Sequence, residues 1–169
     1  TVKWNNLRAC VAEATIRGFT VARQVDTSQA FLYADNEPGT RVLVRVPPEL
    51  AKMLGVGNLC WCDKAAYGLP SAPRGFEKFA SDILCNKCGF TKVKEDGAVY
   101  ILEKEGSYLM LCTWVDDFLV LSDTQELYDD FFTTLRNNYD CDDKPLRHLL
   151  GCGVQQFDNG DFHIDAQKF

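Results

Sequence analysis

The stretch from residue 109 to residue 121 constrains the fold most, because it places two adjacent acids between two strongly apolar runs. Residues 109–115 and 118–121 have the composition of strands in the middle of a sheet, and Asp116 and Asp117 separate them. Ionised carboxylates in such a sheet cost free energy unless they lie at a turn, accept hydrogen bonds or bind a cation. A two-residue turn would place both acids at one end of a hairpin, projecting together.

These acids have an ordinary alternative reading, since Asp-Asp is also a common turn dipeptide that binds nothing. Two close carboxylates repel each other, however, and a hard cation with oxygen ligands, such as Mg²⁺, offsets that repulsion. A third acid favours the cation, because Asp26 follows another alternating, strand-like run at residues 19–25. If the two strands are neighbours, three carboxylates meet at one sheet edge, about the number that two metal ions ~3.5–4 Å apart require.

The remaining hydrophobic periodicity predicts a mixture of helices and antiparallel strands. Apolar residues recur at helical spacing in residues 7–17, in residues 73–88 and in a segment that Asp123 or Thr124 caps. Further strand-like runs are residues 41–46, 58–63 and 98–102, and a turn at Asn159-Gly160 joins a C-terminal hairpin. This order of elements predicts an α+β fold, with an antiparallel sheet and helices packed on one face.

The net charge of −6 argues against a protein whose main task is to bind nucleic acid, because such proteins are usually basic. A Mg²⁺ site must itself be acidic, however, and the chain lacks an initiator Met, so we expect a piece of a longer protein. We see no apolar run of about 18 residues and no signal peptide. The pairs Cys60 with Cys62 and Cys85 with Cys88 raise the question of zinc, but their strand-like and helical surroundings favour buried or half-buried thiols.

Three segments in this order, Val25–Leu32, Ala66–Arg74 and Trp114–Asp117, resemble the reverse transcriptase of copia-type long-terminal-repeat retrotransposons. The similarity runs from about Trp4 to Gln156, nearly the whole chain. It implies a polymerase palm with a ferredoxin-like core and a partial fingers hairpin. The implied organisation is a single palm region over residues 1–169, a fingers-like insertion at about 33–72 and a primer-grip-like hairpin at about 153–165.

The resemblance also implies metal ligands. Asp26 and Asp116 would hold both of two Mg²⁺ ions, which Mn²⁺ could replace, and Asp117 would assist. The backbone carbonyl of Thr27 would be a further ligand. In the family, one ion lowers the pKa of the primer 3′-hydroxyl, and the other grips the triphosphate and stabilises the leaving pyrophosphate.

Three residues are implied to contact the incoming nucleotide. Phe31, five residues after Asp26, resembles the aromatic steric gate that rejects a ribose 2′-hydroxyl, with plain core packing as the alternative. Tyr67 and Gly68 match the loop that approaches the nucleotide, where Gly lets the backbone come close to a ligand. The family usually has Lys-Gln-Ser where this chain has Pro-Ser-Ala at residues 70–72, and the loss weakens the expected substrate contacts.

Three more residues are candidates for contact with nucleic acid. Arg74 would contact a template phosphate or pair with an acid on its own helix. Trp114 replaces the usual Tyr near the primer terminus, and Lys144 is the nearest match to a family Lys that could protonate pyrophosphate. Gly151 resembles the Gly that precedes the primer-grip hairpin.

The implied function is that of an RNA-directed DNA polymerase fragment from a retrotransposon polyprotein, acting by two-metal nucleotidyl transfer to a primer 3′-hydroxyl. Its partners would be an RNA or DNA template-primer, deoxynucleoside triphosphates and the missing fingers, thumb and RNase H regions, with no membrane. We expect it in a cytoplasmic virus-like particle or in the nucleus. The alternative is a catalytically inactive or domesticated palm remnant that acts as a structural or interaction module. A sheet-based RNA-binding module is disfavoured, because it would need exposed aromatic and basic strands.

Overall fold

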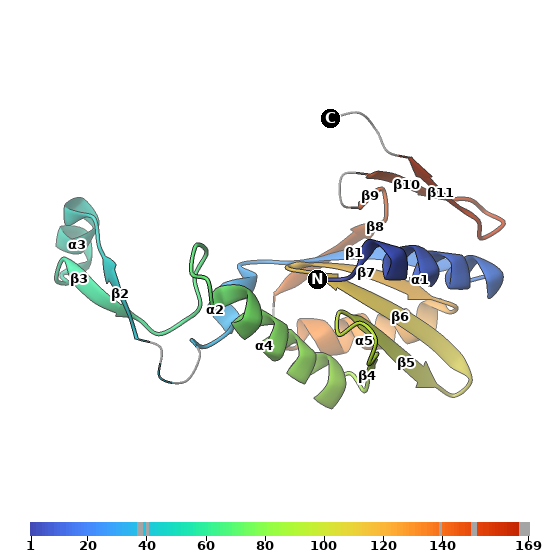
Figure 1. The fold of residues 1–169 in the computed structure, drawn as a ribbon, viewed down its shortest axis with the longest axis horizontal. Coiled ribbons are helices and arrows are strands. Elements are labelled where there is room, and N and C mark those ends of the chain that lie inside the picture. Colours follow the sequence, from blue (N-terminus) through green and yellow to red (C-terminus); the bar gives the residue numbers. More distant parts are fainter. Residues whose placement is uncertain (37–38, 40, 139, 150–151, 166–169) are drawn as a thin grey trace. The chain divides into compact units, whose positions relative to one another are not determined.

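A computed structural model describes residues 1–36, 39, 41–138, 140–149 and 152–165. The chain separates into two compact units, one formed by Thr1–Ser28 with Ser81–Phe169 and the other by Gln29–Ala80. Figure 1 labels the helices and strands of both units. Within the described ranges, no helix combines the length and apolar character needed to cross a membrane.

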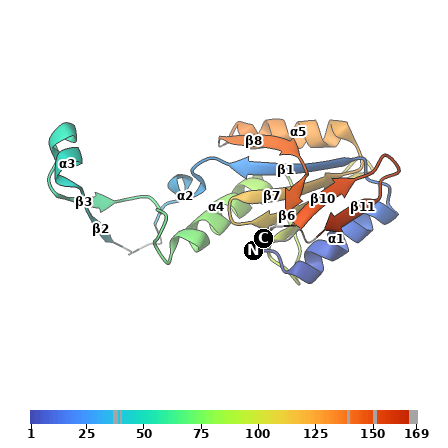
Figure 2. The ribbon, with the colours of Figure 1, turned by 90° about the horizontal axis from the view of Figure 1, so that it is seen from above.

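The first unit is built on a six-stranded antiparallel sheet with the strand order β4-β5-β6-β7-β1-β8. Figure 2 shows β8, β1, β7 and β6 side by side in this sheet. The two strongly apolar strands β6 and β7 lie in its middle, as their composition predicts. The strand bounds are β1 Val21–Thr27, β4 Thr91–Lys92, β5 Val99–Lys104, β6 Ser107–Trp114, β7 Asp117–Ser122 and β8 Cys141–Pro145.

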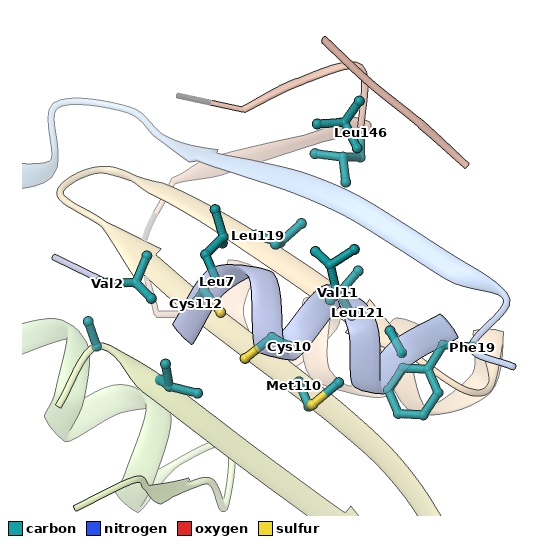
Figure 3. Packing of buried hydrophobic residues seen from close by; sticks show 14 residues of the cluster. Val2, Leu7, Cys10, Val11, Phe19, Met110, Cys112, Leu119, Leu121 and Leu146 are labelled. Carbon is teal, nitrogen blue, oxygen red and sulfur yellow. The ribbon is translucent and has the colours of Figure 1, made fainter. Parts of the chain in front are cut away.

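Helices cover both faces of this sheet, so the expectation of helices on one face alone is wrong. Side chains alternate along a strand, and Phe118 and Leu119 therefore project to opposite faces of β7. Both are at most 1% exposed, so each face needs an apolar cover. Helix α1 (Trp4–Ile16) covers the face of Leu119 and Leu121, as Figure 3 shows. Helix α5 (Gln125–Arg136) lies on the other side of the sheet (Figure 1).

Both helices follow the apolar spacing in the sequence. In α1 the buried residues recur every three or four positions, and they are Leu7, Cys10, Val11 and Ala14. The chain leaves α1 through Gly18, whose φ of 68° suits a residue without a Cβ. Helix α5 begins after Thr124, whose hydroxyl accepts a hydrogen bond from the Leu127 amide. Of the two predicted caps, the structure therefore selects Thr124.

A small three-stranded sheet completes the first unit. It consists of β9 (His148–Leu149), β10 (Cys152–Gln156) and β11 (Phe162–Asp165), in the order β11-β10-β9. The predicted C-terminal hairpin is confirmed, with Asn159 and Gly160 in the turn between β10 and β11. Val154, Phe162 and Ile164 join the apolar cluster under α1. Gly151 lies outside the described residues.

The second unit contains a confirmed hairpin and two helices that the sequence pattern did not predict. Strand β2 (Val42–Arg45) pairs antiparallel with β3 (Leu59–Cys62). The unexpected helices are the short α2 (Ala30–Tyr33) and α3 (Pro48–Leu54), which starts at a proline. Helix α4 (Ala72–Asn86) begins in this unit and confirms the helix predicted at residues 73–88.

Candidate active site

The predicted two-residue turn between the two apolar strands is present and strained, but it lies one residue earlier than expected, at Val115 and Asp116 instead of Asp116 and Asp117. Strand β6 ends at Trp114 and β7 begins at Asp117, and these two residues face each other across the ladder. Only Val115 and Asp116 lie between them. Val115 has a φ of 55°, in the left-handed region that β-branched residues rarely adopt. The close pairing of the flanking strands holds this conformation, which places Asp116 in the turn and Asp117 at the first position of β7.

Asp26 lies beside this turn because β1 pairs with β7. In the register of the sheet, Asp26 is the cross-strand partner of Asp117 on β7 and of Asp142 on β8. Cross-strand partners project to the same face, with Cβ atoms roughly 4.5–5.5 Å apart. Asp26, Asp117 and Asp142 therefore form one transverse line, here called the carboxylate row. Asp116 is the turn residue next to it.

Three hydrogen bonds tie β1 to the turn. The amide and the hydroxyl of Thr27 both donate to the Asp116 carbonyl, at 3.1 and 2.9 Å. The side-chain amide of Gln24 donates to Oδ1 of Asp117 at 3.0 Å. Thr27 is only 2% exposed, so its contacts with the turn are shielded from competing water. Thr27 thereby fixes the turn, and the role of its carbonyl as a metal ligand stays a prediction.

The donor chemistry of the row fits a hard cation. Asp26 is exposed, and Asp116 and Asp117 are half-buried, so their oxygens can reach an ion from solution. Carboxylate oxygens are the ligands that Mg²⁺ prefers. Among the residues that the structure describes, no three acids, histidines or cysteines are already gathered into a coordinating group. The backbone therefore brings the acids to one place, while their side chains are not yet arranged around an ion.

The acids on β8 divide between the two faces of the sheet. Lys144 pairs with Gln24, so this exposed lysine shares the face of the carboxylate row. Asp143 points to the opposite face, where it lies 3.9 Å from the Arg23 guanidinium and accepts a hydrogen bond from the Tyr128 hydroxyl at 3.0 Å. Burial, reinforced by this carboxylate, raises the pKa of Tyr128 above its usual range. Asp143 is thus engaged in packing α5 onto the sheet.

Two polar residues of this face, Gln24 and Asp142, have no place among the predicted site residues. The two-residue period of a strand could have identified Gln24, because it precedes Asp26 by two positions on β1. Asp142 depends on β8, and residues 141–145 show no alternation of apolar and polar side chains. Trp114, a predicted primer contact, ends β6 with 37% of its surface exposed.

The predicted nucleotide-binding residues belong to the second unit. Phe31 is 6% exposed there, and its ring packs edge-on against Tyr67 at a centroid distance of 4.5 Å and against Phe76 at 6.0 Å. Tyr67 is 63% exposed, and Gly68 has a φ of 93°, which only glycine adopts readily. The structure therefore brings Phe31 and Tyr67 together as packing partners. Their roles towards a nucleotide stay predictions, as does that of the exposed Arg74.

The cysteines of the two closely spaced pairs are half-buried thiols. Cys60 and Cys62 lie on β3, and Cys85 lies near the end of α4, with Cys88 two residues beyond that helix. Burial raises the pKa of Cys88 to about 11, so that thiol is protonated at neutral pH.

Comparison with known proteins identifies the family. The family model for “Reverse transcriptase (RNA-dependent DNA polymerase)” matches residues 1–169. The chain is 24% identical over 169 residues to the retrovirus-related Pol polyprotein from transposon RE1 of Arabidopsis thaliana, a match that covers 99% of this chain and 11% of that protein. It is 28% identical over 117 residues to the truncated transposon Ty1-A Gag-Pol polyprotein of Saccharomyces cerevisiae, covering 69% of this chain and 9% of that protein. The chain thus spans about a tenth of the length of these curated relatives. Because the family model matches the chain from end to end, this protein belongs to the reverse transcriptase (RNA-dependent DNA polymerase) family.

Proposed function

We propose that this chain is the catalytic palm portion of an RNA-directed DNA polymerase that adds deoxynucleotides to a primer 3′-hydroxyl. The observation that carries the proposal is the register of β1 against β7, which sets Asp26 opposite Asp117 and beside Asp116. Asp26 and Asp116 would be the principal ligands of two Mg²⁺ ions, with Asp117 and the Thr27 carbonyl assisting. Such ions, when bound, supply Lewis acidity that activates the primer hydroxyl and offsets the charge of the triphosphate.

The residues around the row would orient the reactants. Lys144 lies on the same face as Asp26, and its charge would attract the phosphates of the nucleotide or the departing pyrophosphate. Trp114, exposed at the end of β6, would support the primer terminus. These assignments rest on their positions at the edge of the sheet where the acids lie.

The second unit would supply contacts to the nucleotide and template. The fingers-like insertion predicted at about residues 33–72 would lie within this unit. Phe31 would limit the space at the 2′ position of the sugar, and Tyr67 supports its ring edge-on. Gly68, with its positive φ, would let the backbone approach the nucleotide, and Arg74 would contact a template phosphate.

The parent protein would supply the remaining parts. The relatives are Pol and Gag-Pol polyproteins of transposons, and the chain matches 11% or less of the length of the RE1 and Ty1-A proteins. We therefore propose that further fingers, thumb and RNase H regions accompany this portion in a retrotransposon polyprotein, within a virus-like particle. The hairpin of β10 and β11 would be its primer grip.

Primer extension by the parent polyprotein on an RNA template tests the function. Asp116→Asn and Asp26→Asn should each abolish extension, because each removes a negative charge from a proposed metal ligand. Glu103→Gln, an exposed acid on β5, is the matched control and should extend like the wild type. Equal extension by Asp116→Asn and wild type would end the enzymatic proposal. A wild-type protein without activity would favour the palm remnant that acts as a structural module.

A further inference from the structure

We propose that Gln24 is a positioning residue of the acidic site, which holds one oxygen of Asp117 and leaves the other for a cation. This inference rests on the proposed function, since it concerns the metal that the carboxylate row would bind. The contact that carries it is the hydrogen bond from Nε2 of Gln24 to Oδ1 of Asp117, at 3.0 Å.

The sheet fixes where Gln24 can reach. Gln24 precedes Asp26 by two residues on β1, so both side chains project to the same face. Its cross-strand partners are Leu119 on β7 and Lys144 on β8, and Asp117 is therefore its diagonal neighbour. Leu119 is 1% exposed and, as the cross-strand partner, lies beside the half-buried Gln24. This packing limits the rotamers of Gln24 and directs its amide towards Asp117.

A neutral amide suits this position chemically. It donates a hydrogen bond to the carboxylate without cancelling the negative charge that attracts a cation. An Arg or Lys at position 24 would instead compete with a metal for Asp117. Because Oδ1 already accepts from Gln24, Asp117 would offer a metal chiefly Oδ2, as a one-oxygen ligand. Gln24 does not restrain Asp26 in this way, so Asp26 and Asp117 would differ in how their oxygens coordinate the metal.

The gain expected from this restraint follows from the ordering of one side chain. A carboxylate held before binding loses less rotamer freedom on coordination, and one immobilised side chain is worth a factor of roughly three to ten in affinity. We therefore expect Gln24→Leu to weaken Mn²⁺ binding about three- to tenfold. Leu keeps the bulk over Leu119 and removes the donor. Gln24→Asn, which keeps an amide on a shorter arm, should weaken binding in the same direction.

Mn²⁺ binding to the 169-residue chain, followed by the electron paramagnetic resonance of free Mn²⁺, gives the affinities. The decisive comparison introduces Gln24→Leu both into the wild type and into Asp117→Ala. If Gln24 acts through Asp117, its three- to tenfold effect should shrink to less than about twofold once the Asp117 carboxylate is gone. The same chemical change at the exposed Gln155 of β10 is the control, and Gln155→Leu should bind Mn²⁺ like the wild type. Far-ultraviolet circular dichroism verifies that each variant is folded.

The outcomes separate the two proposals. If the wild type binds Mn²⁺ and Asp116→Asn weakens that binding, the acidic site stands. Gln24→Leu with unchanged affinity, or with an equal effect in the Asp117→Ala background, then overturns the positioning role alone. If the wild type binds no Mn²⁺, or if Asp116→Asn leaves binding intact, the proposed metal site fails and the role of Gln24 fails with it.

Discussion

The strain at Val115 offers a direct test of the turn that presents the aspartates. Its φ of 55° places a β-branched residue in the left-handed region. A residue with a Cβ loses about 1–2 kcal/mol there, whereas Gly in ordinary strand backbone is about 0.5–1 kcal/mol less stable than Ala. The two effects oppose each other, and the first is larger. We therefore expect Val115→Gly to be more stable than Val115→Ala by about 0.5–1 kcal/mol.

Ile101 is the matched control for this comparison. It is also β-branched, lies in the extended backbone of β5 and is 38% exposed, against 36% for Val115. Because Ala and Gly both lack the original side chain, comparing them at one site largely cancels the loss of apolar burial. At position 101 Ala should be the more stable by about 0.5–1 kcal/mol, the reverse of position 115. Urea unfolding followed by circular dichroism gives the four free energies, and Ala more stable than Gly at both sites would refute a left-handed Val115.

Three further perturbations test the fold around the site. Thr124→Ala removes the cap of α5 and should lower the free energy of unfolding by about 1 kcal/mol, measured by thermal unfolding. Thr133→Ala, on the exposed face of the same helix, is the control and should not destabilise the protein. Leu119→Ala empties a position that is 1% exposed and should cost about 2–5 kcal/mol in urea unfolding; a cost below 1 kcal/mol would mean that α1 does not cover this face. Burial opposes ionisation of Asp96, but hydrogen bonds from the Lys3 amide, the Asn6 side chain and the Ala98 amide outweigh it and lower its pKa. The stabilisation that Asp96 gives the folded chain is therefore fully present above the unfolded pKa of about 3.9, and it is lost as pH falls through the lower folded pKa. Asp96→Asn should destabilise the chain at pH 7 and reduce the loss of stability on acidification. An unchanged dependence of the unfolding free energy on pH would contradict this.

The apolar runs on either side of Asp116 and Asp117 predicted the two strands of the acidic hairpin. The unbroken apolar character of residues 109–112 and 118–121 indicates strands that are buried on both faces, so the sequence predicts their central place in the sheet. The same observation should have predicted cover on both faces, because Phe118, Leu119, Val120 and Leu121 cannot all point at one layer of helices. The expectation of one covered face is wrong, because α1 and α5 pack on opposite faces of the sheet.

Strand β8 could not be predicted in this way. Residues 141–145 contain one buried thiol followed by three exposed charged residues and a proline, and they form a strand only because β1 offers them a free edge. Such an edge strand owes its conformation to backbone pairing with a neighbour that is over a hundred residues distant in sequence. For the same reason no local signal placed Asp142 beside Asp26.

The sequence by itself determined which chemistry is available and where each piece of chain turns, because periodicity, caps and adjacent acids act over a few residues. Val115 and Asp116 form the turn for local reasons, and three motifs in order indicate the family. Only the tertiary structure decided which acids are neighbours and which hydrogen bonds restrain them. The pairing of β1 with both β7 and β8 sets Asp26 between Asp117 and Asp142 and gives Gln24 its contact, since register depends on long-range packing that no short segment encodes.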